Sequence, residues 1–429
     1  MRMPQLIDAR AGLTVLLLLG FFPAGSFFSQ TKPRARDLGI PLDGTPGPFN
    51  AITDVEGVEV GYATLISGEG KLVVGQGPVR TGVTAILPRG RTTLEPVFAA
   101  FYAGNGNGDM TGTHWLEETG VLETPILITN TLSVGTVRDA AVSWMVKHGA
   151  NAPFWYPVAA ETSDGRLNDM KGLHVKTEDA ISALESAHGG RIAEGNVGGG
   201  TGMNCHGFKG GTGTASRRLS SEAGSYTLGV LAQCNYGTRS QLRIAGIPVG
   251  REIEGYEPCV AREVDPPARD GTGRPLPLCH DDPRLGAALG EDHEQGSIIV
   301  VVATNAPLTP DQLKRLARRV SLGMGRMGSN HGNGSGDIFI AFSTANPDAD
   351  WGNSNAGHPS LPPPSIIRLP SGALDPLFTA TVEATEEAII NAMLAADTMT
   401  GANYQRSYAI PHDQLKVVLA KHGRLVEKR

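Results

Sequence analysis

Two runs of this sequence consist almost wholly of apolar residues and are too short to cross a membrane. They cover residues 297–303 and 338–342. Apolar runs of four to eight residues bounded by polar or glycine-rich segments are typical of strands buried on both faces. Such strands need packed material above and below them. The sequence therefore predicts sheets that are covered by helices.

Segments with apolar residues at helical spacing alternate with these strands. We expect helices at residues 136–148, 177–187, 310–322 and 376–398. We expect further strands at residues 58–60, 82–87 and 226–232. No Gly-x-Gly-x-x-Gly motif opens an early strand–helix–strand unit, which argues against dinucleotide binding. The pattern predicts an α/β fold in one domain over residues 30–429.

Composition excludes several classes of protein. The 40% hydrophobic and 19% charged content is that of a globular chain, so disorder over most of the length is excluded. The 56 glycines among 429 residues amount to about 13%, against a usual ~7%, but they have no period, so the chain is not collagen-like. A formal net charge of -6 gives no electrostatic footprint for nucleic acid. The partner we expect is a small or peptidic substrate.

The N-terminus has the three parts of a secretory signal peptide. Arg2 and Arg10 precede an apolar run at residues 13–22, which is followed by small residues at 23–26. The alternative is a membrane anchor, but the run is too short to span a bilayer comfortably. We expect residues 1–29 to be removed and the mature protein to be periplasmic or secreted, without a membrane segment.

The four cysteines do not have the paired spacing of zinc ligands. In an oxidising compartment Cys259 and Cys279 could bridge one proline-rich loop. We expect Cys205 and Cys234 to be buried thiols, because apolar and glycine-rich residues surround them. The histidines are scattered and no His-Glu-x-x-His motif is present, so the sequence predicts neither a metal site nor a cofactor.

A glycine-rich loop at residues 331–337 delivers one serine, Ser335, directly onto the apolar run 338–342. A nucleophilic serine is one interpretation. An ordinary turn, a glycosylation sequon at Asn333 and an Asn-Gly hairpin turn are the alternatives. No Gly-x-Ser-x-Gly motif is present, so the sequence gives little support to a Ser-His-Asp triad. The other glycine-rich loop, residues 195–203, lacks the lysine of a phosphate-binding loop.

Several blocks of the sequence, taken in order, resemble the L-aminopeptidase/D-esterase and β-peptidyl aminopeptidase family (DmpA-type enzymes). They extend over nearly the whole chain after residue 30, and two segments, 255–295 and 346–372, look longer than the family pattern. The matching blocks are residues 34–40, 110–115, 195–203, 208–217, 235–237, 316–323, 334–337 and 384–388.

The resemblance implies a fold like that of the N-terminal-nucleophile hydrolases, an αββα sandwich of two stacked sheets between helix layers. It also implies self-cleavage between Gly334 and Ser335, giving chains 30–334 and 335–429. Glycine tolerates the strained backbone that such an attack requires. The new α-amine, with a pKa near ~8, can act as the base that activates the Ser335 hydroxyl.

Further site residues follow from the resemblance. Asn235 resembles the residue that stabilises the oxyanion, and its alternative is a turn-forming asparagine. Glu161 matches the acidic residue expected to bind the substrate ammonium, and its alternative is a solvated loop carboxylate. Thr385, Glu386 and Glu387 lie near the start of the long helix. One of the two glutamates is expected to orient the Ser335 amine, with Thr385 as a possible link, and the alternative is an exposed pair of helix charges.

The resulting hypothesis is a self-processed serine aminopeptidase that releases N-terminal residues from short peptides, amino-acid amides or esters. The alternatives are an amidase or lactam hydrolase with the same nucleophile, and a non-catalytic binding protein on the same fold. By resemblance we expect a homo-oligomer of processed pairs, with a tetramer as the first guess. The sequence does not decide between α- and β-amino acids, or between L- and D-residues.

Overall fold

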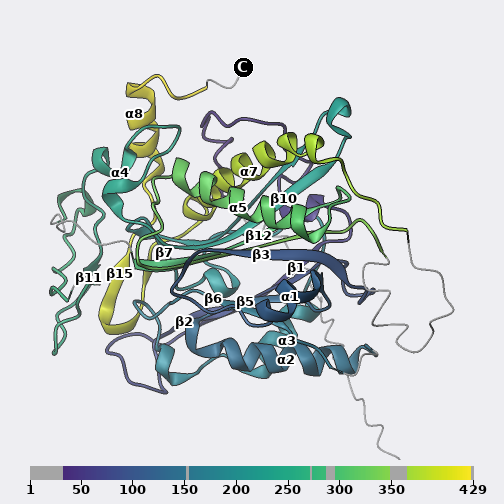
Figure 1. The fold of residues 1–429 in the computed structure, drawn as a ribbon. Helices are drawn as coiled ribbons and strands as arrows, with labels where there is room; N and C mark the ends of the chain where they lie inside the picture. The colour runs from purple at the N-terminus through teal and green to yellow at the C-terminus, as the bar shows by residue number, and fades with distance from the viewer. Residues whose placement is uncertain (1–31, 151–153, 271–272, 287–294, 348–364, 427–429) are drawn as a thin grey trace, which may run out of the picture. The chain divides into compact units, whose positions relative to one another are not determined.

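Two stacked sheets form the centre of the computed structural model (Figure 1), which describes residues 32–150, 154–270, 273–286, 295–347 and 365–426. The predicted signal peptide, residues 1–29, lies outside these ranges. The larger sheet has six strands in the order β4-β3-β13-β12-β10-β9. Their bounds are Val121–Leu122, Val97–Gly106, Gly334–Ser343, Gln295–Thr304, Thr227–Asn235 and Gly211–Arg218.

The smaller sheet has four strands in the order β1-β2-β5-β6. Their bounds are Glu59–Ser67, Val79–Leu87, Ile126–Thr129 and Val158–Glu161. Helices α2 (Val134–Lys147) and α3 (Thr177–Glu185) cover its outer face, whereas α5 (Pro310–Arg326) and α7 (Asp375–Leu394) cover the outer face of the larger sheet (Figure 1). The predicted αββα sandwich is therefore confirmed.

Three hydrophobic clusters fill the spaces between the four layers. One lies between α5, α7 and the larger sheet, a second between the two sheets, and a third between the smaller sheet and α2 and α3. The central strand β12 contributes to the first two clusters, because Ile298, Val300 and Val302 face the helices and Ile299 and Val301 face the other sheet. An apolar residue at every position is what burial on both faces requires.

The helices begin and end close to the positions that the sequence predicts. Helix α5 begins behind Thr309, whose side chain and that of Gln312 form a capping box, and Pro310 occupies the first turn. Further short elements of the described residues lie beyond the sandwich. They include α1 (Thr113–Thr119), α4 (Val249–Glu252), the β7–β8 pair (Asn204–Cys205 and Phe208–Lys209) and α8 (His412–Lys421).

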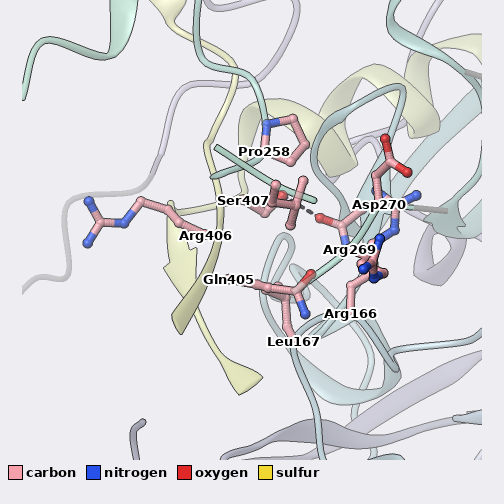
Figure 2. A pocket seen from close by; sticks show the side chains of 10 residues that line it. Arg166, Leu167, Pro258, Arg269, Asp270, Gln405, Arg406 and Ser407 are labelled. Atoms are coloured by element: carbon pink, nitrogen blue, oxygen red, sulfur yellow. Dashed lines mark hydrogen bonds between the residues drawn. The ribbon is translucent and has the colours of Figure 1, made fainter. Parts of the chain in front are cut away.

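The long segment 255–295 extends from one end of the sandwich. Its strand β11 (Cys259–Val260) pairs with β15 (Gln405–Ser407), which in turn pairs with β14 (Met399–Thr400). A small pocket lies between this segment and β15 (Figure 2). Residues 271–272 and 287–294 of this segment, and residues 348–364 of the second long loop, lie outside the described ranges.

All four cysteines are paired. The Cys259–Cys279 disulfide confirms the prediction for that pair. The expectation of buried thiols at Cys205 and Cys234 is wrong, because these residues form a second disulfide with Cα atoms 5.6 Å apart. This pairing could not be predicted from residue patterns, because only the fold brings β7 and the end of β10 together.

Candidate active site

Three neighbouring strands of the larger sheet, β10, β12 and β13, bring polar residues to the same end of the sheet. In the register of the strands, Asn235 at the end of β10 lies opposite Ser297 near the start of β12. Ser297 in turn lies beside Gly336 on β13, and Gly296 lies beside Ser335. Asn235, Ser297 and Ser335 are therefore neighbours at one end of the sandwich.

The two serines point to opposite faces of the sheet. Alternation along β12 places Ile299 and Val301 between the sheets, so Ser297 also faces the smaller sheet. Along β13, Phe339 and Ala341 face the helices, so Asp337 and Ser335 do as well. Ser297 thus shares its face with Asn235, whereas Ser335 does not.

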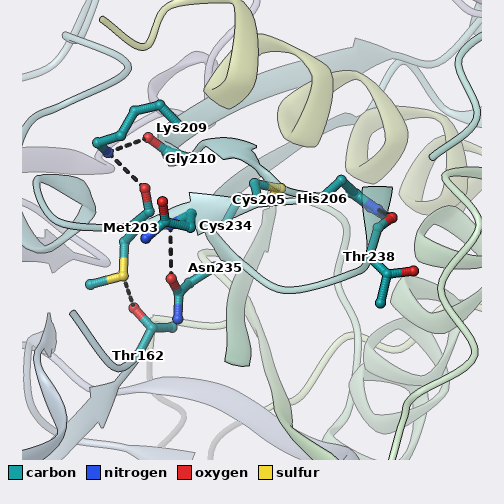
Figure 3. The surroundings of a disulfide bond; sticks show 10 residues. Thr162, Met203, Cys205, His206, Lys209, Gly210, Cys234, Asn235 and Thr238 are labelled. Atoms are coloured by element: carbon teal, nitrogen blue, oxygen red, sulfur yellow. Dashed lines mark hydrogen bonds between the residues drawn. A yellow bond between two sulfur atoms is a disulfide. The ribbon is translucent and has the colours of Figure 1, made fainter. Parts of the chain in front are cut away.

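Asn235 is held by two hydrogen bonds that leave part of its amide available. Its Oδ1 accepts from the Asn204 backbone N–H at 2.8 Å, which is the dashed line at Asn235 in Figure 3. Its Nδ2 donates to the Ser163 carbonyl at 2.9 Å. A side-chain amide has two N–H donors. The second donor of Asn235 is therefore available to a ligand oxygen beside Ser297.

Ser297 combines burial with an uncommitted hydroxyl. The residue is 2% exposed, and its hydroxyl makes no hydrogen bond to any described residue. Its cross-strand neighbour Asn235 has a Cβ about 5 Å away in this pairing geometry. The preceding residue, Gly296, has φ +121°, and a Cβ there would lie 2.0 Å from the Asn235 carbonyl oxygen. Only glycine fits this position.

Ser335 has a more committed environment. Its hydroxyl donates to Asp337 Oδ1 at 2.6 Å, and Asp337 Oδ2 lies 2.6 Å from His331 Nδ1. Its backbone N–H donates to the Gly332 carbonyl at 2.8 Å, and Asn107 Nδ2 donates to the Gly334 carbonyl at 3.0 Å. The Gly334–Ser335 peptide bond is thus held at both ends.

Glu161 is the last residue of β6, and its carboxylate is nearly buried. Oε1 accepts from the Asp109 backbone N–H at 3.2 Å, and Oε2 accepts from the Thr131 hydroxyl. Burial raises the pKa of this carboxyl group above its ordinary value, and the two hydrogen bonds act in the opposite direction. A Cβ on Gly108 would lie 3.1 Å from Glu161 Oε1 and 3.2 Å from the Gly336 Cα. Gly108 therefore lies between the carboxylate and Gly336, the neighbour of Ser297 on β13.

Among the described residues, no hydrogen bond or ion pair joins the three predicted residues of α7 to Ser335. Glu387 accepts hydrogen bonds from Arg36 Nε at 3.0 and 3.1 Å and forms an ion pair with Arg217, which lies at the end of the sheet opposite Asn235. Glu386 pairs with Arg326 at 2.9 Å.

The Thr385 hydroxyl lies buried without a partner among the described residues. A Cβ on Gly323 of α5 would meet the Thr385 side chain at 2.7 Å. No contact in the structure supports a role for these α7 residues in orienting the Ser335 amine.

Sequence reasoning missed Ser297, although it predicted the strand that Ser297 begins. The available signal was the dipeptide Gly296-Ser297 directly before an apolar run, the same pattern that drew attention to Gly334-Ser335. What separates the two serines is the face on which each lies, and this depends on strand register.

A layered αββα sandwich with a buried serine at the start of a central strand, beside an amide donor and a carboxylate, defines a hydrolase of the N-terminal-nucleophile type. The family model described as Peptidase family S58 matches residues 50–407. The chain therefore belongs to peptidase family S58.

Relatives agree with this assignment in sequence and in structure. The chain is 51% identical over 409 residues to a β-peptidyl aminopeptidase BapA of Sphingosinicella microcystinivorans, covering 95% of this chain and 97% of the relative. The L-aminopeptidase D-Ala-esterase/amidase of Ochrobactrum anthropi, described as a variant of the Ntn hydrolase fold, matches with a TM-score of 0.77 and 44% identity over 92% of this chain and 100% of that one. A Burkholderia β-aminopeptidase matches with a TM-score of 0.76 and 43% identity over 91% and 99%.

Within the described residues, no group of three or more His, Cys, Asp or Glu side chains is arranged to hold a metal ion. In the same ranges, no helix has both the length and the apolar composition needed to cross a bilayer.

Proposed function

We propose that this peptidase is an aminopeptidase that releases N-terminal residues from short peptides, and that Ser297 is its nucleophile. The observation that carries the proposal is that Ser297 lies directly opposite Asn235, and that the Glu161 carboxylate approaches Gly336, the neighbour of Ser297 on β13. The resemblance favours Ser335 as the alternative nucleophile. The Ser335 hydroxyl donates to Asp337 and faces the helix layer, so it does not share a face with Asn235.

Each residue of this site has a defined part in the proposed reaction. The substrate ammonium pairs with Glu161, which places the first peptide bond beside Ser297. The Ser297 hydroxyl attacks the carbonyl carbon while its proton passes to the Ser297 α-amine, which cleavage before Ser297 would expose. The C–N bond of the substrate then breaks as the α-ammonium gives this proton to the leaving amine, and the acyl group remains on Ser297 as an ester. The free N–H of Asn235 donates to the oxyanion, and one such donor contributes about 10²–10³ in rate. Water then hydrolyses the ester and frees the enzyme.

Self-cleavage at Gly296–Ser297 would supply the α-amine. The Ser297 hydroxyl attacks the Gly296 carbonyl, the amide bond becomes an ester, and water opens the ester. The positive φ of Gly296 and the close approach of the Asn235 carbonyl support this site, because only glycine lets the chain pass this point directly before Ser297. Ser335 and Asp337 lie on the neighbouring strand, where a carboxylate can help to hold the new amine.

N-terminal sequencing of the smaller chain tests this assignment. Cleavage before Ser297 gives a chain beginning Ser-Ile-Ile-Val-Val, whereas cleavage before Ser335 gives Ser-Gly-Asp-Ile-Phe. We expect Ser297→Ala to leave one uncut chain on a denaturing gel. We expect Ser335→Ala to be cut at the same bond as the wild type. A smaller chain that begins at Ser335 would exclude Ser297 and restore the first prediction.

The names of the relatives guide the choice of substrate. Two of the proteins compared above are a β-peptidyl aminopeptidase and a β-aminopeptidase. We therefore propose that peptides and p-nitroanilides with an N-terminal β-amino acid are among the substrates of this chain. A comparison of β-alanyl and L-alanyl p-nitroanilides measures the preference directly.

We also propose that the protein is exported. The two disulfides support this, because disulfides persist in oxidising compartments. Fractionation of native cells followed by N-terminal sequencing of the larger chain tests the proposal. A larger chain that still begins at Met1 would contradict it.

A further inference from the structure

A single loop connects the proposed ammonium-binding carboxylate to an arginine-containing pocket. Glu161 and Arg166 are five residues apart, at the two ends of this loop. Between them, the Ser163 carbonyl accepts a hydrogen bond from Asn235 Nδ2 at 2.9 Å. The loop therefore passes the oxyanion donor and carries a negative charge before it and a positive charge after it.

The pocket shares a wall with the active site. Its lining includes Arg166, Asn204, Arg269, Asp270 and Ser407 (Figure 2). Asn204 links the two sites, because its backbone N–H donates to Asn235 Oδ1 at 2.8 Å and its side chain accepts from the Ser407 hydroxyl. A group bound in this pocket is thus separated from Asn235 by one residue.

The pocket has a net positive charge, although the chain as a whole has a formal charge of -6. The Asp270 carboxylate is neutralised by Arg274, whose Nε lies 3.0 Å away. Arg269 donates from Nη1 to the Gly273 carbonyl, a neutral acceptor. The Arg166 guanidinium has no hydrogen bond or ion pair with any described residue. A third lining arginine, Arg406, donates from Nε to the Thr400 hydroxyl, so none of the three has a carboxylate partner among the described residues.

We propose that this pocket binds the C-terminal carboxylate of a short peptide, so that the enzyme prefers free dipeptides and tripeptides. The inference rests on the proposed aminopeptidase function. A guanidinium pairs with a carboxylate through two parallel hydrogen bonds and is the side chain best suited to that task. Arg269 belongs to the long segment 255–295, so the segment has a role in substrate choice.

The length of the loop limits the length of the substrate. Five residues extend over at most ~17 Å, and the loop is bent toward Asn235. A peptide whose ammonium pairs with Glu161 and whose carboxylate pairs with Arg166 can therefore contain only a few residues. The two opposite charges fix both ends of a zwitterionic peptide and leave its first peptide bond beside Ser297.

Paired substrates that differ only at the C-terminus test the proposal. A dipeptide ending in leucine is compared with its C-terminal amide, with the N-terminal residue chosen from the p-nitroanilide assay. We expect wild type to favour the free acid by about tenfold in kcat/KM, which corresponds to one charge-assisted contact of about 1.4 kcal/mol. Arg166→Gln is expected to abolish this preference through KM, and Arg269→Gln to reduce it. Arg262→Gln is the matched control, because Arg262 lies over the Tyr404 ring and does not line the pocket.

The possible outcomes separate this inference from the function on which it rests. If the wild type hydrolyses neither the acid nor the amide, the aminopeptidase proposal and the pocket assignment both fall. If both are hydrolysed and Arg166→Gln keeps the wild-type ratio of acid to amide, only the pocket assignment is overturned. A dipeptide amide with a glutamate side chain is the third substrate. If the wild type hydrolyses this amide with the same kcat/KM as the free acid, and Arg166→Gln lowers both equally, recognition of the terminal carboxylate is overturned.

Discussion

We expect Glu161 to carry the difference between an aminopeptidase and a general amidase, because its carboxylate approaches Gly336, the neighbour of Ser297 on β13. We expect Glu161→Gln to lower kcat/KM for an aminoacyl p-nitroanilide by about tenfold or more, since a desolvated charge-assisted bond exceeds the ~0–1 kcal/mol of an exposed ion pair. N-acetylated substrates are expected to be poor for the wild type and little affected by the change.

The same residue predicts a pH dependence. Burial raises the pKa of the Glu161 carboxyl, so the group becomes neutral at a higher pH than an exposed glutamate does. Because only the ionised form attracts the substrate ammonium, kcat/KM is expected to fall as the pH decreases through this raised pKa. Glu161→Gln removes this contribution to the acid limb of the profile.

The comparison of Glu161→Gln with the wild type is valid only if the variant still cleaves itself. A denaturing gel of the purified variant checks this. Cleavage uses no free ammonium and should persist. Equal turnover of acetylated and free-amine substrates by the wild type would favour the amidase alternative.

Asn235, Glu161 and the glycine–serine pattern could all be found from the sequence, because each lies in a recognisable block. The choice between Ser297 and Ser335 could not, because it depends on which face of the sheet each side chain occupies. Strand register is set by contacts between residues far apart in the chain, and a shift of one residue exchanges the two faces.

At the scale of elements, the Cys205–Cys234 disulfide joins the two strands that hold Asn235, the proposed oxyanion donor. Cys205 follows Asn204 in β7, and Cys234 precedes Asn235 in β10 (Figure 3). We expect the double variant Cys205→Ala/Cys234→Ala to lower kcat by about tenfold, with a smaller effect on KM. The reason is that an oxyanion donor stabilises the transition state and contributes little to substrate binding, so its displacement mainly lowers kcat.

The second disulfide provides the matched control for this experiment. Cys259→Ala/Cys279→Ala removes a bridge from the segment 255–295, and its kcat for a p-nitroanilide is expected to match that of the wild type. Thermal unfolding of both variants reports the loss of stability separately. A Cys205→Ala/Cys234→Ala protein with wild-type kcat, or a peptide map showing free thiols at these positions, would refute the positioning role.

The helices were predictable because each has a strong local pattern, such as the capping box and first-turn proline of α5. The partners of their side chains were not. Glu386 and Glu387 lie on a helix that is buried on nearly every side, so helical periodicity could not show that their carboxylates pair with Arg326 and Arg217 rather than with the nucleophile.

For the whole molecule, we propose a homo-oligomer of processed pairs. The proposal comes from the resemblance described above, and a tetramer is the state that it favours. Light scattering of the purified protein is expected to give a mass close to four times that of one chain, which is 45.0 kDa before removal of the signal peptide. A mass equal to a single unit would contradict the proposal.

The strand order of the larger sheet determines whether the cleaved enzyme can refold after denaturation. With cleavage before Ser297, the smaller chain supplies β12 and β13, and the larger chain supplies β10 on one side of them and β3 on the other. The two polypeptides then share one continuous set of backbone hydrogen bonds and two apolar layers. Once such a pair is denatured, its halves must find each other by diffusion, and the single-chain route by which they first folded no longer exists. Heat inactivation of the mature enzyme is therefore expected to be irreversible and to be described by a half-life rather than an equilibrium.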